Sequence, residues 1–274
     1  MPVALLPVHL APSPAWHSPS FDRPVSLRRL GEVTALIVAG CGAYGFTVGA
    51  WRGPELGFYV AIKFPLLMLF TVACNGFLNG LFAQLLGAGL GFRQSMQAIL
   101  ESYSIFAIVL SCLAPLSGGL AWNLAETPPE RIDRAHAFLL CFHTSVIAYA
   151  GLIAHLRMLR SLNGVVDSAG IAVRTFLAWS LGNLIAGAQI GYVLRPYAVT
   201  PGLPIAFLRE HPLEGNFYIA LWASLKKLVS GHTAPAVMIF LMLVIAGALW
   251  LRRAIRNELQ NSVRSSFITQ TNIP

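Results

Sequence analysis

The stretch that decides the fold is FPLLMLFTVACNGFLNGLFAQLLGAGLGF, Phe64 to Phe92, in which no residue carries a charge. A bilayer core of about 30 Å is crossed by about 20 apolar residues in helix, so this run is long enough to span a membrane. Five more uncharged runs occur, at Val33–Trp51, Ser102–Ala125, Ala135–Leu156, Thr175–Leu194 and Leu228–Leu251. The sequence therefore predicts an all-α protein, a polytopic bundle of about six transmembrane helices.

The composition of the whole chain agrees with this reading. Hydrophobic residues make up 56% of the 274 residues and charged residues only 11%, whereas soluble domains carry about a quarter charged residues. This excludes a soluble enzyme, a secreted disulfide scaffold and a disordered chain. The runs are also unbroken rather than alternating, which excludes the strands of a membrane β-barrel.

The net charge of +8 comes from Lys and Arg residues placed near the ends of the runs. They form no basic stripe with interleaved aromatic residues, so we expect no nucleic-acid partner. The positive-inside rule instead predicts that both termini are cytoplasmic, and we expect the protein in a bacterial inner membrane. On that side lie eleven basic residues: Arg23, Arg28, Arg29, Arg93, Arg157, Arg160, Arg174, Arg252, Arg253, Arg256 and Arg264.

The predicted organisation has three parts: a Pro-rich cytoplasmic tail over 1–30, a membrane domain over 31–253 and a cytoplasmic tail over 254–274. Between the last two spans, an outer loop over 195–233 has apolar residues at helical spacing around Trp222, which predicts a helix lying in the membrane interface. The six spans are expected at about 32–51, 58–91, 102–124, 136–156, 175–194 and 234–251.

The second predicted span is too long for a simple crossing. From Phe58 to Gly91 a continuous helix would measure about 51 Å. Either the helix protrudes from the bilayer, or it breaks near Asn75 to Gly80. One crossing with a broken or protruding cytoplasmic half is favoured over two crossings, because two halves of about 16 residues would each be short for a span.

Four polar residues of this second span form a candidate intramembrane site: Lys63, Asn75, Asn79 and Gln84. An ionisable group in a membrane is a functional candidate by default. The structural alternatives carry more weight here, because Lys63 is near enough to the span start to extend to the headgroups. Amides such as those of Asn75, Asn79 and Asn183 commonly form interhelical hydrogen bonds. G-x-x-x-G patterns at Gly45, Gly76 and Gly187 predict close helix contacts.

The outer loop contains a second candidate site, a docking surface made by Arg195, Arg209, Phe217 and Trp222. Here too a structural role is favoured for Arg195, which we expect to pair with Glu210 or Glu214.

Signals of catalysis are missing from the sequence. The spans contain almost no carboxylates, and no nucleophile, metal-ligand or phosphate-loop motif is found. The four cysteines fall singly in four spans, as small hydrophobes do. His143 and His155 lack matching histidines on a second span for haem. We therefore expect a non-enzymatic protein without cofactor or metal.

Two segments resemble a known family. The first segment runs from Ile62 to Leu100, IKFPLLMLFTVACNGFLNGLFAQLLGAGLGFRQSMQAIL, and is followed by an apolar helix ending CLAPL. The second runs from Gly187 to Tyr218, GAQIGYVLRPYAVTPGLPIAFLREHPLEGNFY. Both are similar to segments of bacterial Yip1-like multi-pass proteins. The resemblance implies a helical membrane protein without a known catalytic role. The Asp-Leu-Tyr-Gly-Pro signature of eukaryotic Yip1 proteins is absent, so no GTPase partnership is implied.

Two functions remain open at this stage. The first is a scaffold or accessory subunit of a membrane assembly, with other membrane proteins or further copies of the chain as partners within the lipid bilayer. The second is a transporter or channel for a small solute or ion, built on the polar groups of the second span.

Overall fold

The computed structural model describes residues 26–197 and 204–219, together with isolated positions between 222 and 260. In these residues the only regular secondary structure is helical. The elements are α1 (Leu27–Gly49), η1 (Ala50–Arg52), α2 (Pro54–Leu85), α3 (Phe92–Ala125), η2 (Pro129–Arg131), α4 (Ile132–Asn163) and α5 (Ala169–Val193). Five helices are long and apolar enough to cross a membrane. The all-α membrane fold is thus confirmed in the described residues, together with five of the six expected spans.

Some predicted features lie outside the described residues, apart from isolated positions. They are the sixth span at 234–251, the interfacial helix beyond residue 219, the tail at 254–274 and most of the tail at 1–30. Each of the five described long helices begins before the predicted start of its span. For example, α3 begins at Phe92 rather than 102, and α4 also extends to Asn163 rather than 156.

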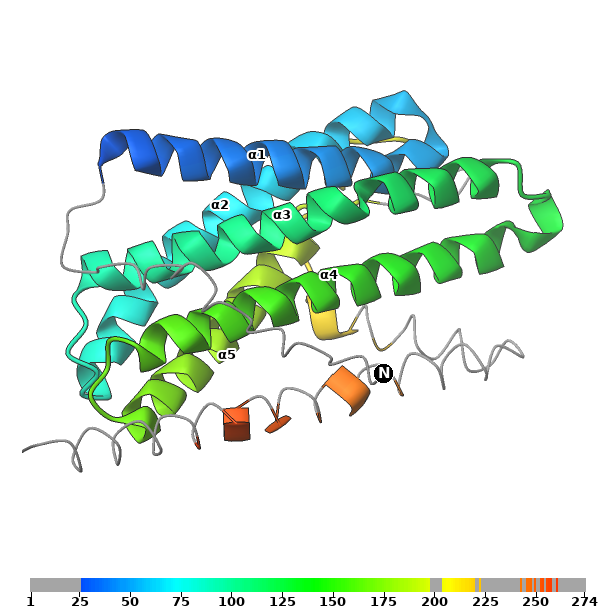
Figure 1. The fold of residues 1–274 in the computed structure, drawn as a ribbon. Helices are drawn as coiled ribbons and strands as arrows, with labels where there is room; N and C mark the ends of the chain where they lie inside the picture. Colours follow the sequence, from blue (N-terminus) through cyan, green and yellow to red (C-terminus); the bar gives the residue numbers. More distant parts are fainter. Residues whose placement is uncertain are drawn as a thin grey trace, which may run out of the picture.

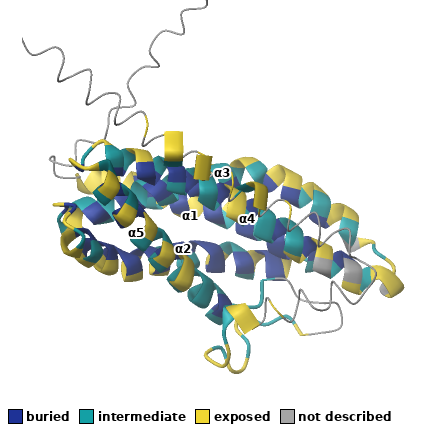
Figure 2. Ribbon diagram, turned by 90° about the horizontal axis from the view of Figure 1, so that it is seen from below, coloured by how far each residue is buried: buried dark blue, intermediate teal, exposed yellow. Residues whose placement is uncertain are grey.

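The five long helices run back and forth along a common direction (Figure 1). One end, which we call the basic end, holds the start of α1 and the α2–α3 and α4–α5 connections. It carries six arginines: Arg28, Arg29, Arg93, Arg157, Arg160 and Arg174. The opposite end holds the α1–α2 and α3–α4 connections, where three arginines, Arg52, Arg131 and Arg134, lie among the acidic residues Glu55, Glu126, Glu130 and Asp133. Buried residues face the middle of the bundle and exposed apolar residues face outward (Figure 2).

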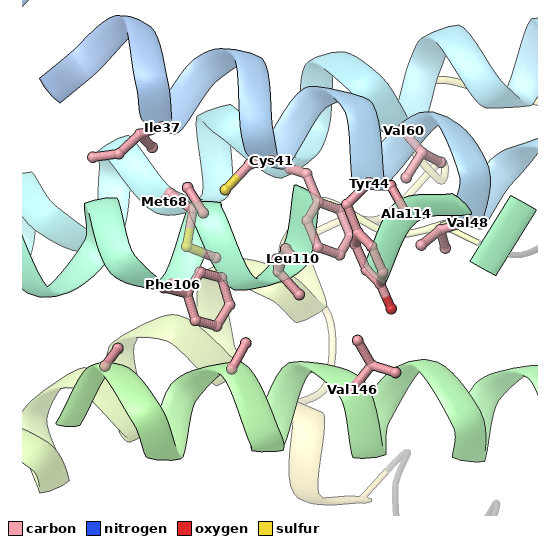
Figure 3. Packing of buried hydrophobic residues seen from close by; sticks show 14 of the residues in the cluster. Ile37, Cys41, Tyr44, Val48, Val60, Met68, Phe106, Leu110, Ala114 and Val146 are labelled. Atoms are coloured by element: carbon pink, nitrogen blue, oxygen red, sulfur yellow. The ribbon is translucent and has the colours of Figure 1, made fainter. Parts of the chain in front are cut away.

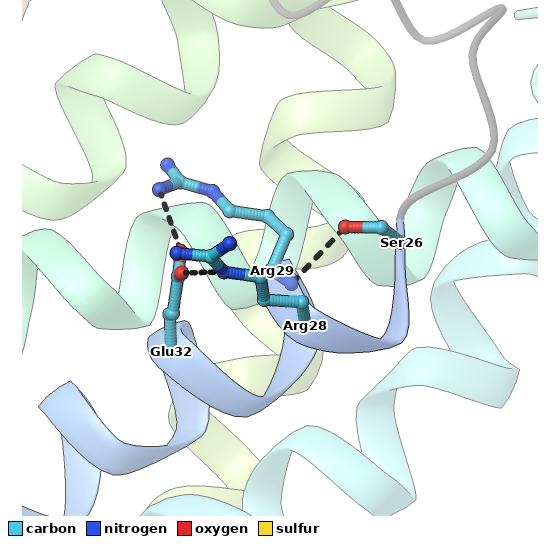
Figure 4. Close-up of polar contacts among 4 residues, drawn as sticks. All are labelled: Ser26, Arg28, Arg29 and Glu32. Atoms are coloured by element: carbon cyan, nitrogen blue, oxygen red, sulfur yellow. Dashed lines mark hydrogen bonds and ion pairs between the residues drawn. The ribbon is translucent and has the colours of Figure 1, made fainter.

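Local signals explain where the first helices begin. Ser26 caps α1, because its hydroxyl accepts a hydrogen bond from the Arg29 backbone N–H at 3.2 Å. Arg28 and Glu32 then form an ion pair at 3.0 Å along the first turn (Figure 4). Gly53, with φ of 115°, makes the turn into α2, and Pro54 occupies the first helical position.

The second span is a single continuous helix through Asn75 and Gly80, so the alternative of a break there is wrong. α2 begins at Pro54 and ends at Leu85, instead of the expected 58 and 91. Its 32 residues measure about 48 Å, so it extends beyond a bilayer core of about 30 Å. The turn follows Leu85, where Gly87 and Gly89 have φ of 73° and 68°, a conformation that glycine adopts without strain.

The largest core cluster joins α1, α2, α3 and α4 around Ile37, Cys41, Tyr44 and Leu110 (Figure 3). Glycine makes this packing possible. A β-carbon on Gly45 would lie 2.6 Å from the Val60 carbonyl oxygen, and one on Gly40 would lie 2.7 Å from that of Ala107. The G-x-x-x-G patterns thus lie at helix contacts, Gly45 against α2, Gly76 against Met96 of α3 and Gly187 against α2.

Candidate intramembrane polar site

One edge of α2 faces α5 and is mostly polar. The residues along this edge follow one another at intervals of four: Lys63, Leu67, Thr71, Asn75 and Asn79. We call the contact between this edge and α5 the α2–α5 seam. α5 runs antiparallel to α2 and places glycines opposite these residues. A β-carbon on Gly191 would lie 3.8 Å from Leu67, one on Gly187 would lie 3.6 Å from Thr71, and one on Gly182 would lie 3.4 Å from Asn75. The missing side chains bring α5 close to the polar edge of α2.

Asn75 and Asn79 are fully buried in the seam. Both atoms of each side-chain amide lack a hydrogen-bond partner among the described residues. The interhelical hydrogen bond that does form uses the backbone instead, because Trp179 Nε1 donates to the Asn79 carbonyl oxygen at 2.8 Å. The structure therefore does not show the amide-to-helix bonding expected from the sequence.

The two asparagine side chains converge on one place. A β-carbon built on Gly182 would lie 3.4 Å from Asn75 Oδ1 and 3.8 Å from Asn79 Oδ1. On α5, Thr175 Oγ1 and Asn183 Oδ1 are also buried without a partner in the described residues. Since each buried unpaired polar atom costs about 1–3 kcal/mol, such a group of six atoms is expensive to keep inside a membrane protein.

The asparagine pair is enclosed toward the basic end by an apolar cluster. Trp179 and Phe176 of α5 pack there with Ala83 of α2 and with Met158 and Leu159 of α4. Phe176 also meets the His155 ring edge-on, with centroids 6.2 Å apart. In the other direction along the seam lie Thr71 and Leu67, and then Lys63. The polar site is therefore shielded from both ends of the bundle.

Lys63 does not lie free on the surface of the bundle, and its extension to the headgroups stays a prediction. Its side chain is fully buried, and Nζ donates a hydrogen bond to the Pro196 carbonyl oxygen at 2.7 Å. The ammonium also lies 5.0 Å from the Phe207 ring centroid and 5.9 Å from that of Tyr197. Because the chain folds back over α2 after α5, the loop covers Lys63.

Gln84 does not belong to the same site. Its side chain is exposed and lines an open surface groove with Phe77, Gly80, Leu81 and Phe92. The four residues predicted together thus separate into three places. Lys63 lies under the loop, Asn75 and Asn79 lie in the middle of the seam, and Gln84 lies on the outer face.

The outer candidate surface is partly used for internal packing. The guanidinium carbons of Arg195 and Arg209 lie 3.7 Å and 4.5 Å from the Tyr192 ring centroid. Arg209 also donates to the carbonyl oxygens of Pro212 and Glu214. Within the described residues neither Glu210 nor Glu214 forms an ion pair with Arg195, so the expected pairing is wrong.

Phe217 and Trp222 lie at the margin of the described residues. The Phe217 ring packs edge-on against Tyr218, with centroids 5.5 Å apart, and Trp222 is 62% exposed. Burial changes two pKa values nearby. It lowers the pKa of Arg195 and raises that of Tyr197, whose hydroxyl is buried and unpartnered in the described part of the chain.

Two other buried polar contacts join neighbouring helices. The Tyr44 hydroxyl and His143 Nδ1 are 2.9 Å apart, joining α1 to α4, and Ser102 donates to the Ala154 carbonyl oxygen at 3.0 Å. Among the residues that are described, no three His, Cys, Asp or Glu side chains come together as metal ligands.

Comparisons of the chain with family models, curated proteins and solved structures give no match. The resemblance to Yip1-like proteins stays a prediction.

The sequence identified part of the site and missed the rest. Asn75, Asn79 and Asn183 were recognisable as amides within apolar runs. Thr175, Trp179 and Gly182 were not singled out, because small and aromatic residues are ordinary in membrane helices. The i, i+4 series from Lys63 to Asn79 was the available signal.

Proposed function

We propose that this protein moves a small solute or ion across a bacterial inner membrane along the α2–α5 seam, with both termini cytoplasmic. The observation that carries the proposal is the pair of buried asparagines, whose four amide atoms have no partner in the described residues. Buried polar groups in native proteins are nearly always hydrogen-bonded. Unpaired amide groups between two helices are therefore candidates for binding a polar ligand.

The rest of the seam supports this function. The site lies between two helices that are long and apolar enough to span a membrane, and it is closed by Trp179 on one side and by Leu67 and Lys63 on the other. Such an enclosed site suits alternating exposure to the two membrane faces. The basic end, with its six arginines, supports the cytoplasmic assignment for that end.

Flux through reconstituted vesicles tests the proposal. Purified protein in liposomes should raise the permeability to at least one member of a panel of ions and small polar solutes, compared with empty liposomes. Replacing both asparagines, N75L with N79L, should remove that increase while leaving the protein folded. A panel in which nothing moves would refute the proposal.

A scaffold or accessory role is the second proposal. Its support is an exposed apolar stripe on α5, made by Leu177, Leu181, Leu184 and Ile185, which lies on the helix face away from the buried Thr175 and Asn183. Partner helices can pack on such a stripe as well as lipid. Purification in mild detergent should then yield a stable oligomer or a co-purifying membrane protein, and a uniform monomer without partners would count against it.

A further inference from the structure

An open groove lies on the outer face of the bundle, between the last turns of α2 and the first turn of α3. Its volume is about 360 Å³, and it is lined by Phe77, Gly80, Leu81, Gln84 and Phe92. Gly80 brings the two helices together here, because a β-carbon on it would lie 3.1 Å from the Phe92 α-carbon. The groove therefore lies at the basic end of the bundle, where α2 turns into α3 (Figure 1).

The walls of the groove are apolar and face outward. Phe77 is 60% exposed and Leu81 is 42% exposed. Phe70 and Cys74, which are also exposed, continue this surface along α2 at intervals of four and three residues, so all four lie on one helix face. On the outer surface of a membrane bundle such a face meets lipid, whose acyl chains are as apolar as leucine. An acyl chain can therefore lie along α2 from the groove toward Phe70.

The end of the groove that is nearest to the turn is polar and lies at the depth of the headgroups. From Phe64 to Leu85, α2 carries no charge and rises about 33 Å, close to the thickness of about 30 Å of a bilayer core. Gln84, in the last turn and exposed, is therefore at the boundary of the hydrocarbon. A lipid whose acyl chain lies in the groove has its headgroup beside Gln84 and the start of α3.

Arg93 gives this boundary a positive charge. It follows Phe92 in the first turn of α3 and is exposed. Within the described part of the chain it forms no hydrogen bond and no ion pair, and the sequence from 56 to 100 contains no acidic residue. A basic group beside a crevice between two membrane helices is the kind of site that binds an anionic lipid headgroup.

We propose that the groove between α2 and α3 binds one acyl chain of an anionic phospholipid, with the headgroup phosphate next to Gln84 and Arg93. Apolar walls, a polar end at the membrane boundary and an unpaired arginine match the three parts of such a lipid. The site is independent of the proposed transport function, because it lies on the outer face of α2 rather than in the α2–α5 seam.

Native mass spectrometry of the full chain in detergent measures the binding. The protein is titrated with phosphatidylglycerol and, separately, with phosphatidylcholine that carries the same acyl chains. We expect the first phosphatidylglycerol to bind several-fold more tightly. R93Q should weaken that binding about fivefold, the contribution of one arginine near an anionic lipid surface, and should leave phosphatidylcholine binding unchanged.

R174Q is the matched control. Arg174 is an exposed arginine at the same end of the bundle, but it belongs to α5. Its replacement removes the same charge and should leave binding of the first phosphatidylglycerol unchanged. Size-exclusion chromatography and circular dichroism check that both variants are folded.

Photo-cross-linking locates the lipid in the wild-type protein without any substitution. Phosphatidylglycerol with a diazirine in one acyl chain is bound, irradiated and mapped by peptide mass spectrometry. We expect cross-links between residues 70 and 92, at the end of α2 and the start of α3.

Equal binding of the two lipids would overturn the proposal, as would equal weakening by R174Q and by folded R93Q. Cross-links found only on other helices would overturn the assignment to the groove and indicate that another occupant, such as a helix of a partner protein, covers it. Each of these results is distinct from the outcome of the flux measurement on Asn75 and Asn79.

Discussion

Replacing a buried asparagine by leucine should make this protein more stable, and the size of the gain can be worked out from the structure. Asn75 leaves Oδ1 and Nδ2 buried without a partner in the described residues. Each such atom costs about 1–3 kcal/mol. Leucine has the same number of side-chain heavy atoms and no polar atom, so N75L removes both penalties.

The net gain is smaller than the sum of the two penalties. The tetrahedral leucine side chain is bulkier than the planar amide of asparagine, and Gly182 lies close to Asn75, so some repacking is needed. A misfit of this kind costs about 1–3 kcal/mol. We expect the free energy of unfolding of N75L to exceed that of the wild type by about 1–3 kcal/mol, with N79L behaving in the same direction.

Steric trapping in bicelles measures unfolding free energies without denaturant and suits this comparison. Asn123 supplies the matched control, since it is an exposed asparagine near the end of α3 whose Nδ2 donates to the Gly119 carbonyl oxygen at 2.7 Å. N123L should change the stability by less than about 0.5 kcal/mol. A loss of more than about 1 kcal/mol in N75L would refute the reasoning, because it would mean that the amide has a stabilising protein partner.

Three other predictions follow from particular contacts. G45A should destabilise the bundle by about 1–3 kcal/mol, because its β-carbon would lie 2.6 Å from the Val60 carbonyl oxygen. G187A should be tolerated, because its β-carbon would lie 3.6 Å from Thr71. Thermal unfolding in detergent compares the two variants, and equal effects would contradict the assigned contacts. K63M should loosen the loop that begins at Arg195, because it removes the hydrogen bond to Pro196. The cysteine introduced by L208C should then be labelled faster in the K63M background, and an unchanged labelling rate would argue against the contact. Burial raises the pKa of Tyr197, so its neutral form contributes stability. This stability is complete below the unfolded-state pKa of about 10 and is lost as the pH rises through the higher folded-state pKa. The free energy of unfolding measured from pH 8 upward should therefore fall less steeply in Y197F than in the wild type, and identical slopes would refute this.

The sequence predicts the class and course of the helices well, because length and charge decide whether a segment can cross a bilayer. The uncharged run from Phe64 to Phe92 corresponds to most of α2, and the arginines flanking the runs separate the two ends of the bundle. The exact helix ends depend on local chemistry such as the turn at Gly87 and Gly89. Whether Asn75 to Gly80 formed a break could not be decided by composition, since glycine and asparagine occur both in breaks and in packed helices.

The candidate site was only partly predictable, because it depends on which helices become neighbours. Lys63 could be placed near the start of a span, yet nothing in the sequence shows that the Pro196 carbonyl folds back to meet it. Likewise, Gln84 belongs to the same helix as Asn79, but it lies on the outer face. The pairing of α2 with the glycines of α5 is a property of the tertiary packing, and it selects Asn75 and Asn79 from the polar residues of α2.

An experimental structure in a lipid nanodisc, at a resolution that shows ordered water and bound solutes, tests the central claim most directly. We predict density beside Gly182 within hydrogen-bond distance of the amides of both Asn75 and Asn79, and its loss in N75L. Amides that instead bond to each other or to Thr175 and Asn183, with no density between them, would contradict the proposed polar ligand site.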